Sequence, residues 1–311
     1  MRVYVAGGGG MLGDAVYRTL REDHDVAVSD IVVNEDWLHY CDVRDFADYR
    51  CNVDQFAPDL LIHLAAHTDL EYCETSIDDA YRTNTLGVEH AATIANTRDI
   101  PLVYISTAGI FDGRKDSYDD WDEPNPLSVY GRSKYLGERH VQRCVARHFI
   151  FRAGWMMGGG LEKDKKFVGK LVRQLIAGER RLYVVDDKLG TPTYTLDFAR
   201  NIERMIGTRF YGLYNQVCGG ETSRLEVACE LVRLLGLDQM VEVIPVSSDH
   251  YARDYHAPRP ASERLVNYKL ALRGMNHMRD WRICLADYVR EHFADVVVAP
   301  GVAARAVERV A

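Results

Sequence analysis

The chain lacks the features that mark several classes of protein. No apolar run approaches the roughly 20 residues of a membrane-spanning helix. The first predicted strand begins at Val3, which leaves no room for a signal peptide. The formal net charge is −8, and no extended stripe of basic residues is present. We therefore expect a cytoplasmic protein that binds neither a membrane nor nucleic acid.

Cysteine is sparse and follows no metal-binding pattern. The seven cysteines are an odd number, and none belongs to a Cys-x-x-Cys pair. This favours buried, reduced thiols over disulfides or a zinc site, so we expect no metal. Repeats and low-complexity segments are also missing. The 311 residues, 47% of them hydrophobic, are enough for a nucleotide-binding domain and a smaller lobe.

A glycine turn follows the first predicted strand. The apolar run Val3–Ala6 leads directly to Gly7, Gly10 and Gly13, and then to a helical pattern. Strand, glycine turn and helix in this order can hold a dinucleotide pyrophosphate, because the backbone approaches closely and the helix N-terminus faces the phosphates. A second strand ends at Asp30, near the roughly 20-residue offset of a ribose-binding acid. That carboxylate would repel a 2′-phosphate, so we expect NAD(H) to be favoured, with NADP(H) as the alternative.

Two further strands are predicted at Leu60–Ala66 and Leu102–Ile105. In an open parallel sheet, ligands lie beyond the carboxyl ends of the strands. The small Ala65 and Ala66 would let a cofactor approach the backbone, and the hydroxyl of Thr107 could hydrogen-bond a substrate oxygen. An ordinary turn at the strand end is the alternative for this threonine.

Tyr130 and Lys134 stand four residues apart in a segment that is predicted as helix. At that spacing both side chains leave the same helical face. A lysine ammonium beside a phenol favours the phenolate, so we expect the pKa of the tyrosine to fall towards neutrality. Such a pair suits carbonyl reduction or alcohol oxidation. The spacing also arises on ordinary exposed helices, and the glycine turn and strand ends support the chemical interpretation.

These motifs resemble the extended short-chain dehydrogenase/reductase superfamily and, within it, the dTDP-4-dehydrorhamnose reductase family. The resemblance runs from residue 1 to about residue 290. Besides the glycine turn, the motifs that carry it are Ile105-Ser106-Thr107 before Phe111-Asp112-Gly113, Asn125-Pro126-Leu127 before Tyr130 and Lys134, Arg152 with Trp155, Val184–Asp187 before Gly190–Tyr194, and Arg259-Pro260.

Strands and helices alternate up to about Arg152, as a doubly wound parallel sheet requires. We expect an α/β protein with a Rossmann-type NAD-binding domain at residues 1–152, to which the chain returns around residues 183–206. Residues 153–311 mainly form a smaller α/β substrate lobe. By family analogy, the helices that contain Tyr81 and Tyr130 form a homodimer interface. Residues 294–311, beyond the resemblance, are either an oligomer contact or a loose tail.

By the resemblance, Thr107, Tyr130 and Lys134 form the catalytic triad of a reductase that acts on a nucleotide-linked 4-keto-6-deoxy sugar with NAD(P)H. Tyr130 would donate the proton, while Asp42 and Val43 would touch the adenine. The residues that we expect to bind the cofactor are Gly7, Gly10, Met11, Leu12, Asp30, Asp42, Val43, Ala65, Ala66, Tyr130 and Lys134. Those that we expect at the substrate are His67, Thr107, Ala108, Trp155, Lys166 and Arg259.

Several of these substrate residues have a structural alternative. His67 is also typical of a turn, Lys166 of a solvated helix start, and Arg259 of a rigid surface loop. Trp155 could stack on the sugar or nucleotide, or pack in the core between the lobes.

The chain departs from the family around the sugar. The family usually has Asp-Tyr after the threonine, whereas this chain has Ala108-Gly109. The loss of polar partners changes which pattern of sugar hydroxyls a site accepts, so the sequence leaves the identity of the sugar open. The same positions argue against 4,6-dehydratases and cysteine-dependent epimerases. The alternatives are a nucleotide-sugar 4-epimerase that retains its NAD, and a non-catalytic regulatory or binding subunit with the same fold.

Overall fold

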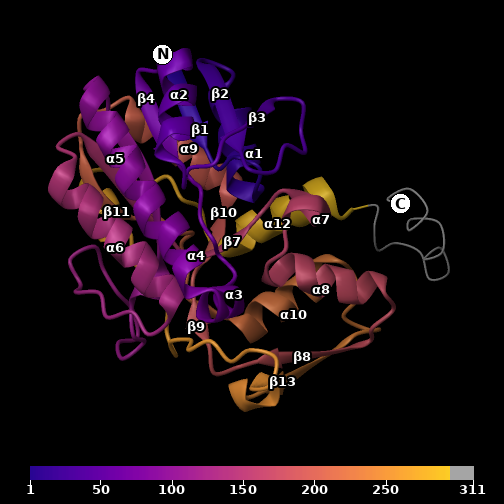
Figure 1. Cartoon of the computed structure of the whole chain (residues 1–311). Helices are drawn as coiled ribbons and strands as arrows, with labels where there is room; N and C mark the ends of the chain where they lie inside the picture. Colours follow the sequence, from indigo (N-terminus) through magenta and orange to yellow (C-terminus); the bar gives the residue numbers. More distant parts are fainter. Residues whose placement is uncertain (295–311) are drawn as a thin grey trace.

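The computed structural model describes residues 1–294, and an open parallel β-sheet lies at its centre (Figure 1). The strand order is β11-β6-β5-β4-β1-β2-β3, and all neighbours are parallel. The order reverses between β1 and β4, the kind of position where ligands bind to such sheets. The predicted Rossmann-type α/β fold is confirmed. The strands are β1 (Arg2–Ala6), β2 (Asp25–Asp30), β3 (Leu38–Tyr40), β4 (Leu60–His63), β5 (Leu102–Thr107), β6 (His148–Ala153) and β11 (Gly212–Asn215).

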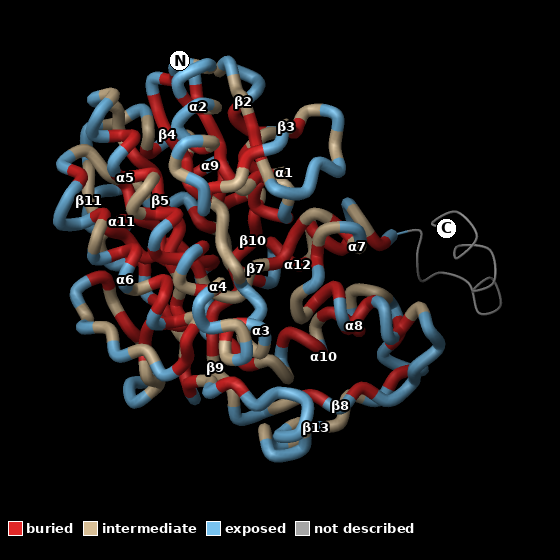
Figure 2. The backbone as a smooth tube through the Cα atoms, in the orientation of Figure 1, coloured by how far each residue is buried: buried red, intermediate tan, exposed pale blue. Residues whose placement is uncertain are grey.

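Successive side chains of the central strands enter two separate cores, which explains why these strands read as continuous apolar runs. Figure 2 shows that the backbone of these strands consists mainly of buried residues. Val3 and Val5 of β1 pack on one face of the sheet, and Tyr4 and Ala6 on the other. Residues of α1 and α9 belong to the first core, and residues of α2, α5 and α6 to the second. These helices are α1 (Met11–Leu20), α9 (Thr195–Ile206), α2 (Phe46–Phe56), α5 (Gly87–Arg98) and α6 (Val129–Cys144).

The segment around Tyr81 and Asn84, predicted as one helix, is interrupted. α4 (Ile77–Tyr81) passes into a π-helical turn (Arg82–Leu86) before α5 begins. In this turn the buried Asn84 amide accepts a hydrogen bond from the backbone N–H of His67 at 2.8 Å and donates one to its carbonyl at 3.0 Å. The departure from regular helix thus serves a tertiary contact, as is common for π-helical turns.

A second lobe contains α8, α10 and a two-stranded parallel ladder of β8 and β13 (Figure 1). α12 packs against α10 and against β10, so it contacts both this lobe and the segment that leads into α9. The principal elements are α7 (Gly160–Lys163), α8 (Phe167–Ile176), β8 (Arg181–Val185), α10 (Arg224–Leu234), β13 (Glu242–Val246) and α12 (Trp281–His292). The remaining short elements are α3 (Leu70–Thr75), β7 (Trp155–Met157), β9 (Leu189–Gly190), β10 (Pro192–Tyr194), β12 (Thr222–Ser223), α11 (Tyr268–Leu272) and 3₁₀ turns at Ala108–Ile110 and Ser248–Tyr251.

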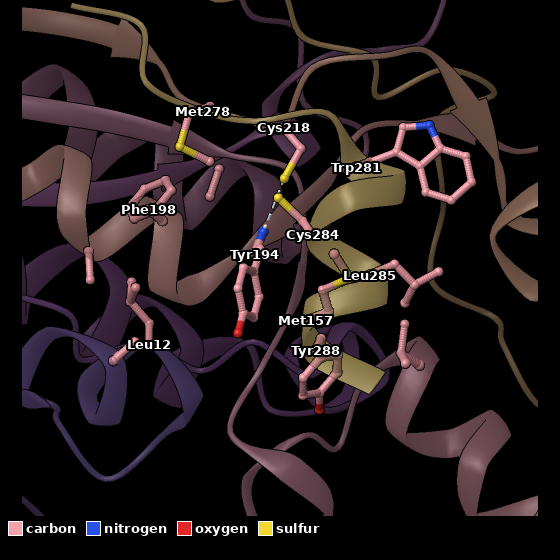
Figure 3. Packing of buried hydrophobic residues seen from close by; sticks show 14 of the residues in the cluster. Leu12, Met157, Tyr194, Phe198, Cys218, Met278, Trp281, Cys284, Leu285 and Tyr288 are labelled. Atoms are coloured by element: carbon pink, nitrogen blue, oxygen red, sulfur yellow. Dashed lines mark hydrogen bonds between the residues drawn. The ribbon is translucent and has the colours of Figure 1, made fainter. Parts of the chain in front are cut away.

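One apolar core joins the two lobes. It includes residues of β1, α9, α10 and α12, and Figure 3 shows the part around Cys218 and Tyr288. The backbone N–H of Tyr194 donates to Cys218 Sγ at 3.4 Å, and the Tyr288 hydroxyl donates to Asp164 Oδ2 at 3.0 Å. This shared core fixes the second lobe relative to the sheet.

The chain returns to the sheet through α9, which packs against α1, and β11, which pairs with β6. β8 lies at the start of the range 183–206 predicted for this return, but it pairs with β13 in the second lobe. The domain boundaries at 1–152 and 153–311 stay a prediction. The interpretation of residues 294–311 concerns, apart from residue 294, positions outside the described residues.

All seven cysteines are free thiols. Four are buried, whereas Cys51, Cys144 and Cys229 are exposed, so the expectation of buried thiols is correct only in part. Among residues 1–294, no helix has the length and apolar character needed to cross a membrane.

Candidate active site

The glycine turn lies against the end of β4. Gly7 has a φ of +82°, and a Cβ there would stand 2.2 Å from the backbone nitrogen of Ala65. A Cβ on Gly13 would stand 2.1 Å from the carbonyl oxygen of Gly8. In contrast, a Cβ on Gly10 would meet nothing within 4 Å. The turn is therefore closed on its protein side and open beside the N-terminus of α1, which fits a dinucleotide pyrophosphate.

Asp30 borders this turn at the end of β2. Its Oδ2 accepts a hydrogen bond from the N–H of Gly9 at 2.9 Å, and its Oδ1 accepts one from the N–H of Val32 at 3.0 Å. The ammonium of Lys163 lies 3.5 Å from the Gly9 carbonyl, but it is paired with Glu35 at 2.7 Å. The Asp30 carboxylate thus lies beside the glycine turn, and the adjacent Lys163 ammonium already has a partner.

Asp42 and Val43 follow β3, next to Asp30. The N–H of Cys41 donates to the Asp30 carbonyl at 3.1 Å, which holds this segment beside the end of β2. Asp42 is paired with Arg44 at 2.8 Å, and hydrogen bonding from that guanidinium lowers the pKa of the Asp42 carboxyl. The contact of Asp42 and Val43 with an adenine stays a prediction.

The structure brings Thr107, Tyr130 and Lys134 together at the end of β5. Thr107 Oγ1 and Tyr130 Cε1 each lie 3.5 Å from the position that a Cβ on Gly109 would take. Tyr130 and Lys134 lie in the first turns of α6, whose N-cap Ser128 accepts a hydrogen bond from the N–H of Gly131 at 3.0 Å. Tyr130 is partly buried and Lys134 is buried.

The expected lowering of the tyrosine pKa is wrong for this structure. Burial raises the pKa of Tyr130 to about 12, although its contact with Thr107 works in the opposite direction. Burial also lowers the pKa of Lys134 to about 7, against the attraction of Glu138. The lysine is therefore only partly charged at neutral pH, and burial is the largest cause of the raised pKa of the phenol. Tyr130 carries its proton at neutral pH.

Residues of both lobes meet at the segment after β4. The ammonium of Lys166, the N-cap of α8, donates to the carbonyl and hydroxyl oxygens of Thr68, both at 2.9 Å. Arg259 is paired with Glu71 at 2.8 Å. The imidazole of His67 lies 2.8 Å from a carboxylate oxygen of Asp79. The predicted substrate residues His67, Lys166 and Arg259 thus lie around one segment.

Trp155 contacts two residues, Glu263 and Arg224, that the sequence analysis missed. Its Nε1 donates to Glu263 Oε2 at 2.8 Å, and the guanidinium of Arg224 lies 3.9 Å from its ring centroid. Arg224 also lies 4.7 Å from the ring centroid of Phe167, and burial lowers its pKa to about 10. The available signals were positional: Arg224 follows Thr222-Ser223, residues typical of a helix N-cap, and Glu263 stands four residues after Arg259.

Ala108 is buried in the 3₁₀ turn after β5, beside the predicted triad. Its side chain adds no polar group to the site. Ala65 lies against the protein side of the glycine turn. Its N–H donates to the Ala6 carbonyl at 3.1 Å, and its backbone packs against Gly7.

A Rossmann sheet with an open glycine turn and a threonine, a tyrosine and a lysine at one strand end defines the extended short-chain dehydrogenase/reductase superfamily, as the resemblance predicted. The chain belongs to the RmlD substrate binding domain family, whose model matches residues 1–293.

Three proteins show how far the similarity extends. A dTDP-4-dehydrorhamnose reductase of Mycobacterium tuberculosis is 32% identical, covering 92% of this chain and 91% of the relative. The crystal structure of a dTDP-4-dehydrorhamnose reductase from Clostridium acetobutylicum superposes with a TM-score of 0.85 at 31% identity, over 94% of this chain and 99% of that one. A reductase of that name from Bacillus anthracis, in complex with NADP, gives a TM-score of 0.84 at 30% identity, over 93% and 99% of the two chains.

Proposed function

We propose that the protein is a nicotinamide-dependent reductase of a nucleotide-linked 4-keto-6-deoxy sugar. The observation that carries this proposal is the placement of Thr107, Tyr130 and Lys134 at one strand end, beside an open glycine turn. Relatives that align over nearly the whole chain are named dTDP-4-dehydrorhamnose reductases, which supports the same reaction.

Tyr130 is the proton donor in this proposal. When bound, the nicotinamide supplies the hydride that reduces the keto carbon. Because the pKa of Tyr130 is about 12, the phenol is protonated at neutral pH and can give its proton to an alkoxide, which is a stronger base. The Thr107 hydroxyl, which contacts the phenol, would orient the carbonyl oxygen.

Lys134 acts through its charge. Its pKa of about 7 lets it gain a proton when negative charge develops on Tyr130, which stands one helical turn away. Its ammonium lies 4.3 Å from the ring centroid of Tyr104, which fixes the side chain on the sheet side of α6. In the same position it would hold the ribose of the cofactor.

For the nucleotide end of the substrate we propose Arg224, Lys166 and Arg259. Arg224 lies over two aromatic rings and is partly buried, and a guanidinium in such a setting suits a diphosphate. Lys166 and Arg259 add positive charge from neighbouring segments of the second lobe. Trp155, held between Arg224 and Glu263, would form one wall of the sugar position.

The cofactor preference is a separate part of the proposal. The Bacillus anthracis reductase is in complex with NADP, whereas the Asp30 carboxylate beside Gly9 supports NADH for this chain. We expect a higher kcat/KM with NADH, and a reduced advantage in Asp30→Ala because the repulsion of a 2′-phosphate is lost. Steady-state kinetics with both cofactors measures this, and a clear preference of the natural protein for NADPH would overturn it.

The experiment that tests the reaction is NADH oxidation with a panel of dTDP-, UDP- and GDP-linked 4-keto-6-deoxy sugars. Stoichiometric oxidation with one of them supports the reductase. Sugar interconversion without net oxidation would indicate the NAD-retaining 4-epimerase, and no reaction at all would favour the non-catalytic subunit. We further propose a cytoplasmic location. We also propose a homodimer through the helices that contain Tyr81 and Tyr130, and sedimentation of the purified protein tests this oligomeric state.

A further inference from the structure

A carboxylate that the proposed chemistry does not use stands beside the catalytic residues. Glu263 belongs to the segment that follows Arg259, and its N–H donates to the Leu189 carbonyl at 2.8 Å. Its side chain is fixed as well, because Oε2 accepts the hydrogen bond from Trp155 Nε1 at 2.8 Å. With one carboxylate oxygen held in this way, the direction of the other oxygen, Oε1, is set.

Gly109 locates that second oxygen relative to the triad. A Cβ on Gly109 would stand 3.5 Å from Glu263 Oε1, 3.5 Å from Thr107 Oγ1 and 3.5 Å from Tyr130 Cε1. All three groups therefore face one point, and no two of them are more than about 7 Å apart. This separation is within the span of one sugar ring. Because residue 109 is a glycine, it places no side chain of its own between them.

Trp155 makes this arrangement rigid. A Cβ on Gly190 would stand 2.2 Å from two atoms of the indole ring, so the ring lies directly on the backbone there. The guanidinium of Arg224 lies over the ring at 3.9 Å. An indole held by both contacts has its Nε1–H in a fixed direction. The hydrogen bond from Nε1 then fixes the orientation of the Glu263 carboxylate.

The negative charge of Glu263 acts on two neighbouring groups, Tyr130 and Arg224. It contributes to the raised pKa of Tyr130 and opposes the lowering of the Arg224 pKa by burial. Within residues 1–294, Oε1 has no hydrogen-bond donor, although the side chain is partly buried. A carboxylate oxygen in such a place is stabilised by a ligand that donates to it, and it disfavours a ligand that cannot.

We propose that Glu263 determines substrate specificity by accepting, through Oε1, a hydrogen bond from a hydroxyl or amino group on the sugar carbon next to the keto carbon. This inference rests on the proposed function, in which Thr107 and Tyr130 bind the keto oxygen. In a 4-keto-6-deoxy hexose, C5 carries the methyl group, so the donor belongs to C3. Substrates that lack a donor at C3 leave the carboxylate unsatisfied and are rejected.

The test compares kcat/KM for 3-hydroxy, 3-amino and 3-deoxy versions of the accepted 4-keto sugar nucleotide. The natural protein should prefer a substrate with a C3 donor over the 3-deoxy one by about 10- to 100-fold. Glu263→Ala should reduce this ratio to within about threefold, and Glu263→Gln, which keeps the shape, should reduce it less. An unchanged ratio in both variants would overturn the inference.

Glu221→Gln is the matched control. Glu221 also lies near the second lobe's Arg264, at 3.4 Å, but its side chain is 72% exposed, so its loss removes a negative charge without touching the site. For Glu221→Gln, the ratio of kcat/KM between the substrate with a C3 donor and the 3-deoxy substrate should equal that of the natural protein. A preference for the 3-amino over the 3-hydroxy substrate that disappears in Glu263→Gln would identify the donor as an ammonium, and equal rates would mean that either donor satisfies Oε1.

The outcomes separate this inference from the proposed function. If the natural protein oxidises NADH with none of the sugars, the proposed function fails. If it reduces the 3-deoxy and 3-hydroxy substrates equally well, the reductase stands and the role of Glu263 fails. Activity of Glu263→Ala on the 3-deoxy substrate confirms that the variant is folded.

Discussion

At the scale of single residues, the role proposed for Tyr130 depends on its protonation state. Removing a phenol from water disfavours its charged form, and in this structure that effect is the largest influence on the pKa of Tyr130. A phenol with a pKa of about 12 is a donor at neutral pH. This agrees with the reduction of a ketone, in which a proton must be delivered.

Tyr130→Phe should lower kcat by about 100-fold or more, because it removes the hydroxyl that donates the proton and leaves the ring in place. Binding of NADH, followed by fluorescence titration, should change little. Phe at this position keeps the packing against Val129 and Ala80. Retention of most of the turnover by the variant would contradict the assignment of Tyr130.

Lys134→Met should lower activity and yet stabilise the fold at low pH. The pKa of Lys134 falls from 10.5 to about 7 on burial, so below pH 7 the folded protein holds an ammonium at a cost of about 5 kcal/mol. Between about pH 7 and 10.5 the unfolded chain binds this proton and the folded chain does not, so the free energy of unfolding of the natural protein rises with pH.

The methionine variant lacks this rise. Its advantage in free energy of unfolding should therefore be largest near pH 6 and should shrink towards pH 10, as measured by urea unfolding at each pH. A difference that stays constant with pH would mean that Lys134 has the same pKa in the folded and unfolded chain.

At the scale of elements, two glycines of the turn differ in a way that the sequence does not show: Gly13 is packed against backbone, and Gly10 faces open space. Gly13→Ala places a Cβ against the backbone of Gly8, at 2.1 Å from its oxygen, and should cost at least about 2 kcal/mol of stability. Gly10→Ala points into open space and should cost less than about 1 kcal/mol. It should instead weaken NADH binding at least tenfold, because its methyl group enters the space proposed for the pyrophosphate.

Thermal unfolding without cofactor and NADH titration check these two variants together. If Gly10→Ala binds NADH as tightly as the natural protein, the open side of the turn is not the pyrophosphate position. If Gly13→Ala is as stable as the natural protein, helix α1 has moved away from the turn.

The elements that could be predicted from the sequence are those whose signals are local. The apolar run Val3–Ala6 and the glycines after it, and the Thr222–Ser223 cap of α10, follow from short-range chemistry. The π-helical turn at Arg82–Leu86 could not be predicted, because it depends on the contact of Asn84 with His67, 17 residues away in sequence. Helical periodicity carries no information about such a contact.

At the scale of the whole molecule, the candidate site is completed by the second lobe. Thr107 and Tyr130 follow from motifs within the first 152 residues, but Glu263 reaches the site through a hydrogen bond to Trp155 that spans 108 positions. Pairings at this distance are set by how the lobes pack. The sequence therefore carried more information about the part of the candidate site in the first 152 residues than about the part that the second lobe adds.

Arg259→Gln should raise KM for the sugar nucleotide by about tenfold and leave NADH binding unchanged, since the residue lies in the second lobe, across from Glu71. Its effect on stability should stay within about 1 kcal/mol, because the ion pair is partly exposed. Arg98→Gln is the control: it loses a comparable pair with Asp54, at 2.7 Å, between α5 and α2. Equal KM values for the two variants would remove Arg259 from the substrate site.

The central claim is that the chain reduces a nucleotide-linked keto sugar at the expense of a nicotinamide. The most direct measurement counts the NADH oxidised per molecule of dTDP-linked 4-keto-6-deoxy sugar consumed by the purified protein, with its Tyr130→Phe variant alongside. The account predicts one NADH for each alcohol formed, and almost none with the variant. Consumption of the sugar without net oxidation of NADH, or equal rates for the two proteins, would contradict it.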